Sequence, residues 1–379
     1  MEKHGISGNE EFIKTKLGRW KDVEINIGII GNYGVGKSSF INAIRGLRDD
    51  DNGAAETGVT ETANVATVYH HPTNNKIKFW NLPSIGTPDY PTDTYSDKVG
   101  LEKYDTFLIL AAGRFTINDL LLAEKVKSMK KSFFFVRTKI DQDVQHERRK
   151  ARFNEEAMLN DIREDCLKNL ERFEAGDEVV FLISNHYPAK WDFARLTQAI
   201  LDVLPQHQKE SLTLSLDLLT SHSKDILKRK VEILRGRIWM VAAASAAAAV
   251  IPLPGLSIVV DFRLLTHEVN LYKSQLGLPK EKSNEFLKLT KENREIILKF
   301  CFTNAAELAK ILTVFAAGSA VEEVARFIPI IGSAIAGGIS FGSTYYFLRQ
   351  CLNELEKTAL NLLDETNANV VRDIVNSVD

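Results

Sequence analysis

Short apolar runs alternate with amphipathic stretches from about residue 23 to residue 204. Six runs have the length and the β-branched or aromatic content of strands, at residues 23–30, 64–71, 76–83, 106–113, 132–140 and 178–184. Between most of them, apolar residues repeat with helical spacing, at residues 37–47, 118–129, 155–173 and 193–204. This alternation predicts an α/β domain over residues 23–204, with a mostly parallel six-stranded sheet and helices on both faces.

The strand-like pattern stops after Pro205, where long helical periods take over at residues 210–239 and 291–315. Residues 205–379 are therefore expected to form a second, all-α domain. The first 22 residues contain a short helical pattern, NEEFIKTKLGRW, which we expect to pack on that helical domain.

Composition agrees with two domains, because 379 residues are too many for one ordinary core. The 48 basic and 50 acidic residues nearly balance, so no global field favours nucleic acid or anionic lipid. The 3 cysteines lie far apart, which is typical of a reducing compartment. The ends show no secretion or lipidation pattern, so we expect a cytoplasmic protein whose membrane affinity, if present, depends on local features.

A phosphate-binding loop is predicted between the first strand and the first helix. The stretch GIIGNYGVGKSSF contains Gly31-x-x-x-x-Gly36-Lys37-Ser38 in the strand–loop–helix context that this motif requires. Backbone N–H groups of such a loop meet phosphate oxygens, and the helix N-terminus adds partial positive charge. We expect Lys37 to reach the β- and γ-phosphates and Ser38 to bind Mg²⁺. The candidate nucleotide contacts are Gly31, Asn32, Tyr33, Gly34, Val35, Gly36, Lys37, Ser38 and Ser39.

Two strand ends carry residues suited to guanine. Thr138-Lys139-x-Asp141 offers a carboxylate that can accept hydrogen bonds from N1–H and the 2-amino group of guanine, whereas adenine has no such pair of donors. Lys139 would lie along the purine. Ser184 and Asn185 end the last strand, where a loop N–H can contact O6 of the base. An ordinary polar pair at a strand end is the alternative interpretation of Ser184 and Asn185.

These motifs resemble the interferon-inducible immunity-related GTPases, also called p47 GTPases. The resemblance rests on GKSSFINAIRGL, TGVTET, FWNLPSIGTPDY, RTKID and LISN, and covers the whole predicted nucleotide-binding domain. Weaker support comes from GRIWM and the helical C-terminal half. Ser38 after Lys37 matches the lysine–serine class of that family.

The resemblance implies a dynamin-like GTPase with a helical domain built from both chain ends. It also implies binding of GTP and GDP, self-association through the nucleotide-binding domains, and accumulation on vacuoles that contain intracellular pathogens. The chain departs from the family pattern in lacking the myristoylation signal that several members carry. We expect membrane association to be peripheral rather than spanning.

The run TGVTET, residues 57–62, resembles the family's switch I segment. One of Thr57, Thr60 and Thr62 would complete the Mg²⁺ shell with Ser38, and the pattern does not choose among them. Glu61 matches a switch I glutamate that would orient a water or a ribose hydroxyl, so Glu61 and Lys37 are the candidate catalytic residues. A solvent-exposed loop acid is the alternative for Glu61.

The segment FWNLPSIGTPDY departs from the D-x-x-G motif of switch II. Asn81 replaces the aspartate, so it can accept a hydrogen bond from a metal-bound water but brings no charge. Ser84 replaces the glycine, and its Cβ restricts the approach of its N–H to the γ-phosphate. Ile85 stands where small GTPases have a water-positioning glutamine. We therefore expect nucleotide binding with slow hydrolysis; a hydrolysis-deficient scaffold that responds to bound nucleotide is the alternative.

Two apolar segments, residues 239–260 and 327–348, are long enough to span a bilayer. Prolines interrupt both, and alanine is only weakly lipophilic, so buried helical hairpins are favoured over membrane insertion. A membrane-embedded GTP-binding protein is the third functional alternative.

Overall fold

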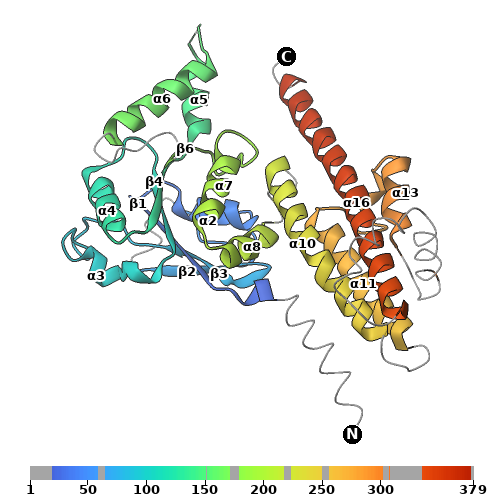
Figure 1. Cartoon of the computed structure of the whole chain (residues 1–379). Coiled ribbons are helices and arrows are strands. Elements are labelled where there is room, and N and C mark those ends of the chain that lie inside the picture. Colours follow the sequence, from blue (N-terminus) through green and yellow to red (C-terminus); the bar gives the residue numbers. More distant parts are fainter. Residues whose placement is uncertain are drawn as a thin grey trace. The chain divides into compact units, whose positions relative to one another are not determined.

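The computed structural model describes residues 19–58, 65–150, 152–170, 179–216, 223–249, 256–301, 307 and 335–376. Two compact units divide the chain, a sheet unit of residues 19–222 and a helical unit that takes in the chain from residue 223. Figure 1 shows both units and labels their elements.

The sheet unit contains six strands with the spatial order β2-β3-β1-β4-β5-β6. All neighbouring pairs are parallel except β2 with β3, which are antiparallel. The predicted six-stranded, mostly parallel sheet is therefore confirmed. The strands are β1 (Ile25–Gly31), β2 (Thr67–His71), β3 (Asn74–Asn81), β4 (Thr106–Ala111), β5 (Ser132–Arg137) and β6 (Val180–Leu182).

Helices cover both faces of this sheet, as its continuously buried central strands require. One face packs on apolar side chains of α3, α4 and α6, while α2 and α7 meet through Phe40 and Phe193, whose ring centroids lie 5.7 Å apart. The helices of the unit are η1 (Arg19–Asp22), α2 (Lys37–Arg45), α3 (Tyr95–Val99), η2 (Leu101–Lys103), α4 (Ile117–Ser128), α5 (Ile140–Glu147), α6 (Glu155–Leu170), α7 (Phe193–Val203) and α8 (Gln206–Ser215).

The fifth strand is shorter than the sequence pattern predicts. β5 ends at Arg137, and Ile140 begins α5 instead of continuing the strand. Lys139 turns the chain between them with φ 62°, in the left-handed region. Ile140 is fully buried at the start of α5, so the apolar pattern of the sequence continues past the end of the strand and does not mark the turn.

The division between the units falls later than the expected boundary after residue 204. α8 contacts α7 and η1, and Gln208 Nε2 donates to the carbonyl of Glu24 at 2.9 Å. Asn74 Nδ2 also donates to Ser211 Oγ at 3.2 Å. α8 and residues 19–22 therefore belong to the sheet unit, whereas the expected packing of the preceding residues lies outside the described part of the chain.

The helical unit has only helices and their connections among its described residues. They are α10 (Lys224–Ala249), α11 (Leu256–Gln275), α12 (Asn284–Leu287), α13 (Lys291–Lys299) and α16 (Ile335–Asn376). α10 packs along α16 and α11, and Arg237 Nε on α10 donates to buried Glu268 Oε1 on α11 at 3.1 Å. The expected helical domain is thus observed from residue 223 onward.

The two apolar segments coincide only in part with described helices. α10 includes residues 239–249 and α16 includes residues 335–348, whereas residues 250–255 and 327–334 lie outside the described ranges. Among the helices that are described, none is both long enough and apolar enough to cross a membrane. The choice of buried hairpins for the complete segments stays a prediction.

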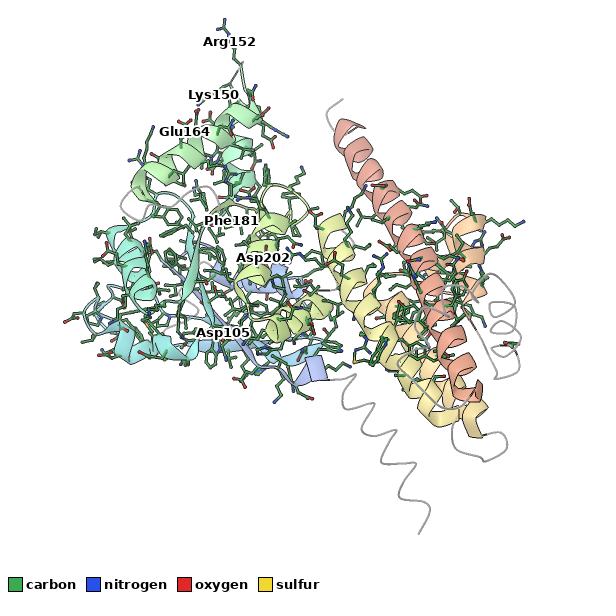
Figure 2. All side chains as sticks on the ribbon, in the orientation of Figure 1. Asp105, Lys150, Arg152, Glu164, Phe181 and Asp202 are labelled. Atoms are coloured by element: carbon green, nitrogen blue, oxygen red, sulfur yellow. The ribbon has the colours of Figure 1, made fainter. Side chains whose placement is uncertain are left out.

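The basic run at residues 147–152 lies at the surface where it is described. Figure 2 shows Lys150 and Arg152 projecting away from the ribbon before α6, in agreement with their exposure. Lys150 pairs with Glu147 within the same run. The described part of this run is therefore a solvated surface.

Candidate functional site

The predicted phosphate loop connects the central strand β1 to α2. Gly31 ends β1 so close to β4 that an added Cβ would lie 2.3 Å from the carbonyl oxygen of Leu110. Gly36 precedes α2 with φ 89°, a conformation that L-residues with a side chain rarely adopt. The loop therefore needs glycine at both ends, and it presents the N-terminus of α2, where N–H groups without helical partners favour an anion.

Lys37 and Ser38 open α2 next to this loop. Lys37 Nζ donates to the carbonyl of Gly31 at 2.8 Å and to that of Asn32 at 3.2 Å, so its amine folds back over the loop. Ser38 is buried, and its Oγ accepts from Asn81 Nδ2 at 3.4 Å. The structure thus brings the lysine and serine of the motif together with the last residue of β3.

The loop after β5 is tied directly to the phosphate loop. Thr138 is fully buried, and its Oγ1 donates to the carbonyl of Val35 at 2.7 Å. Lys139 then reverses the chain, which places Asp141 in the first turn of α5. The candidate base-binding residues therefore project from a turn that is bonded to the phosphate loop.

The loop after β6 is also hydrogen-bonded to the phosphate loop. Asn185 Nδ2 donates to the carbonyl of Gly36 at 3.0 Å, while Asn185 Oδ1 is buried without a hydrogen-bond partner among the described residues. Ser184 is fully buried, and its Oγ accepts from the N–H of His186 at 3.2 Å, which shapes the loop. Ser184 and Asn185 therefore lie in a loop that is bonded to the predicted phosphate loop, and their contact with a base stays a prediction.

Asp192 holds the far end of this loop against β6. Its carboxylate accepts from Leu182 N at 2.9 Å and from Arg163 at 2.7 Å. Burial raises the pKa of Asp192, but the hydrogen bonds from Arg195, Leu182 N–H and Arg163 outweigh burial and lower it below its ordinary value. Arg195 also lies over the ring of Phe181, with its guanidinium carbon 4.2 Å from the ring centroid. The loop that carries Asn185 is therefore anchored at both ends.

The switch II segment leaves β3 beside the phosphate loop. Asn81 is 2% exposed, and its Oδ1 has no hydrogen-bond partner among the described residues. Ser84 Oγ donates to the carbonyl of Gly31 at 3.2 Å, the same oxygen that accepts from Lys37. The side chain that replaces the usual glycine therefore attaches switch II to the phosphate loop.

The residues present fit a hydrated Mg²⁺ ion. Buried oxygens normally have donors, and Asn81 Oδ1 lacks one although it lies next to Ser38. A water bound to the cation would supply that donor, and the Ser38 hydroxyl is a suitable oxygen ligand.

Thr57, the third candidate ligand, is half-buried just beyond Ala55. The side-chain amide of Asn42 fixes the backbone of Ala55: its Oδ1 accepts from Ala55 N at 2.6 Å and its Nδ2 donates to Ala55 O at 2.9 Å.

The other switch I candidates are not part of the described structure. Thr60, Glu61 and Thr62 fall within residues 59–64, which lie outside the described ranges. The catalytic role of Glu61 and the choice among the three threonines stay predictions.

Sequence reasoning missed one buried acid near the loop, Asp119 at the start of α4. Its Oδ2 accepts from Thr116 N and Oγ1, both at 2.8 Å, whereas its Oδ1 is buried without a hydrogen-bond partner among the described residues. The spacing of Thr116 and Asp119 is a signal for a helix N-terminus. Nothing in that spacing indicates the proximity of Lys37, whose charge acts on Asp119.

Comparison with known sequences decides the family. The profile described as "Interferon-inducible GTPase (IIGP)" matches residues 1–365. The chain belongs to the interferon-inducible GTPase family. It is 32% identical over 360 residues to Interferon-gamma-inducible GTPase 10 of Mus musculus, a match that covers 93% of this chain and 84% of the relative. It is also 34% identical over 348 residues to Interferon-inducible GTPase 5 of Bos taurus, covering 88% and 74%.

A solved structure resembles this interferon-inducible GTPase family member more distantly. The structure of Aquifex aeolicus Era Y63A bound to GDP·AlF4⁻ matches with a TM-score of 0.32 and 22% identity, covering 48% of this chain and 57% of that one. The fold assignment therefore rests on the strand order and on the strand–loop–helix geometry of the site.

In this interferon-inducible GTPase family member, Thr138 and Asn185 both bond to the predicted phosphate loop. Asn81 and Ser84, which differ from the D-x-x-G pattern, lie beside the same loop, at the end of β3 and shortly after it. The contacts of these residues with a nucleotide stay predictions.

Proposed function

We propose that this protein binds GTP and GDP in the Mg²⁺ form and hydrolyses GTP slowly. The proposal rests chiefly on the bonds from Thr138 and Asn185 to the carbonyls of Val35 and Gly36. These two bonds connect the loops that carry the predicted guanine-binding residues directly to the predicted phosphate loop. Membership of a GTPase family gives independent support.

In this proposal, each part of the nucleotide meets a different group of the protein. Phosphate-loop N–H groups and the N-terminus of α2 bind the α- and β-phosphates, and Lys37 turns from its carbonyl partners toward the β- and γ-phosphates. Asp141 accepts the two guanine donors, with Lys139 along the ring. Ser38, a switch I threonine and Asn81 would hold Mg²⁺, which supplies positive charge to the phosphate oxygens.

A nucleotide titration tests this function. Purified protein should bind GDP and GTP in the presence of Mg²⁺, bind ATP at least about 10⁴-fold more weakly, and lose affinity for GTP when EDTA removes the metal. Isothermal titration calorimetry, with chromatography of any co-purified nucleotide, provides the readout. Equal affinity for ATP and GTP would contradict the assignment of Asp141, and no nucleotide binding would contradict the function itself.

Slow hydrolysis follows from the two switch II residues. Asn81→Asp restores a charged partner for metal-bound water, and Ser84→Gly removes both the Cβ and the bond to the Gly31 carbonyl. Because losses of outer-shell partners cost about 10–100-fold, we expect the double variant to hydrolyse GTP about 10–100-fold faster in single-turnover assays.

Ser84→Ala is the matched control for this prediction, because it removes the hydroxyl and its bond but keeps the Cβ. If Ser84→Ala reproduces Ser84→Gly, the bond matters more than the side-chain volume. Unchanged or slower hydrolysis in the Asn81→Asp/Ser84→Gly variant, with nucleotide affinity intact, would contradict the explanation of slow turnover.

We further propose that the protein self-assembles through its nucleotide-binding domain and associates peripherally with the membranes of pathogen-containing vacuoles. Family membership and the lysine–serine motif support this part, in which Glu61 would act across the interface. The Ser84 bond favours a second candidate, a scaffold that binds nucleotide without turnover. Hydrolysis per molecule should rise with protein concentration for an assembling GTPase and stay flat for the scaffold.

A further inference from the structure

Asp119 is a fully buried carboxylate with one oxygen unused by the fold. Oδ2 completes a capping box with Thr116 at the start of α4. Oδ1 is also buried and has no hydrogen-bond partner among the described residues. The cap explains one oxygen only. Buried polar atoms without hydrogen-bond partners are uncommon, so an unpartnered carboxylate oxygen at this place suggests a role other than capping the helix.

The start of α4 lies at the junction of the phosphate loop and switch II. β4, which leads into α4, is the parallel neighbour of β1, with Leu110 paired to Gly31. Asn118, next to Asp119, lies so close to Gly86 that a Cβ there would be 2.3 Å from Asn118 Nδ2. Asn118 Oδ1 also accepts from Thr92 Oγ1 at 3.3 Å. The first turn of α4 therefore touches the segment that follows Ser84.

The charges around Asp119 place it in the field of the phosphate-binding lysine. Burial is the largest influence and raises the pKa of Asp119 above its ordinary value, although the hydrogen bonds with Thr116 and the charge of Lys37 act in the opposite direction. On the other side, Tyr95 donates to the carbonyl of Pro83 in switch II at 2.8 Å, and the charge of Asp119 acts on Tyr95 as well. The charge of Asp119 thus acts on Lys37, which follows the phosphate loop, and on Tyr95, which bonds to switch II.

We propose that Asp119 sets the balance between GTP and GDP, because its negative charge cancels part of the attraction between Lys37 and the γ-phosphate. The inference rests on the proposed nucleotide binding. GTP carries about one more negative charge than GDP, and this charge is added at the end of the phosphate chain that Lys37 reaches. A carboxylate buried near Lys37 therefore weakens binding of the triphosphate more than binding of the diphosphate, since such a pair is poorly screened by water.

The test compares GDP with a non-hydrolysable GTP analogue. Asp119→Asn removes the charge while keeping an oxygen for the cap, and Asp119→Ser provides a second neutral variant if the first does not fold. Calorimetric titration with Mg²⁺ should show the ratio of the two affinities shifting about tenfold toward the triphosphate in both variants, as expected for removal of one nearby charge at the effective dielectric of a protein.

Two controls separate charge from structure. Ile117→Gly weakens the first turn of α4 at an exposed position and keeps both hydrogen bonds of Asp119 Oδ2 with Thr116, so it perturbs the start of α4 without removing a partner of the carboxylate. Asp97→Asn removes an exposed acid on α3. Both should keep the wild-type ratio. An unchanged ratio in the neutral Asp119 variants, equal weakening of both nucleotides, or the same shift in Ile117→Gly would overturn the inference. A wild-type protein that binds neither nucleotide would instead overturn the proposed function.

Discussion

Replacing Lys37 by alanine should lower the affinity for GDP and GTP by at least about 100-fold. Its ammonium group is the only side-chain charge that the phosphate-loop motif itself supplies, and a hydrogen bond to a charged group contributes about 1.5–3 kcal/mol. The loop N–H groups remain in the variant, but they cannot replace a charge that reaches two phosphates. Calorimetric titration of the purified variant with each nucleotide measures the loss.

Lys37 also bonds to the carbonyls of Gly31 and Asn32, so its removal changes the loop itself. Thermal unfolding of the variant, followed by circular dichroism, separates a local loss from general unfolding. Lys76→Ala, at an exposed position of β3, is the matched control and should keep wild-type affinity. A Lys37→Ala protein that is folded and binds GDP within a few-fold of the wild type would refute the role given to the loop.

The second large effect is expected at Asp141. Asp141→Asn exchanges a pure hydrogen-bond acceptor for an amide with one acceptor and one donor. Guanine presents two donors at N1 and the 2-amino group, so one of them would face the amide NH₂. A site that leaves such groups unpaired rejects the ligand by about 10⁴-fold, and we expect a loss of that size for GDP.

The same exchange should improve recognition of xanthine nucleotides. Xanthine carries a carbonyl in place of the 2-amino group, which can accept from the new amide. Competition of GDP and xanthosine diphosphate against a fluorescent nucleotide measures both changes, with Asp161→Asn at an exposed position of α6 as the matched control. Wild-type preference for GDP in Asp141→Asn would mean that Asp141 does not read the base.

The fold was largely accessible from the sequence because all six strands and the longer helices carry their own periodic patterns, whereas the short helices α3 and α5 were not predicted. Predicted strand positions fail mainly at their ends, as at Lys139, where a single left-handed residue starts a helix inside an apolar run. The domain boundary was missed for a different reason. α8 has the same helical pattern as the segments after it, and only its tertiary hydrogen bonds to Glu24 and Asn74 assign it to the sheet unit.

The candidate site was predictable where a motif is local and hidden where it depends on distant contacts. The phosphate loop and Thr138-Lys139-x-Asp141 have recognisable spacing. The bond from Thr138 to Val35 joins residues separated by 103 positions, so no local pattern contains it. The sequence did not single out Asp119, because the three-residue spacing between Thr116 and Asp119 is already explained by helix capping.

The bonds from Thr138 and Asn185 to the phosphate loop also affect how the two ends of a nucleotide cooperate. With the two loops already joined, binding one end of the ligand brings the other end to its partners at high effective concentration. Little loop entropy is then lost on binding, which favours affinity without further contacts. Guanosine and pyrophosphate added as separate molecules would not show this gain in affinity, because only a ligand in which base and phosphates are covalently linked can contact both loops at once.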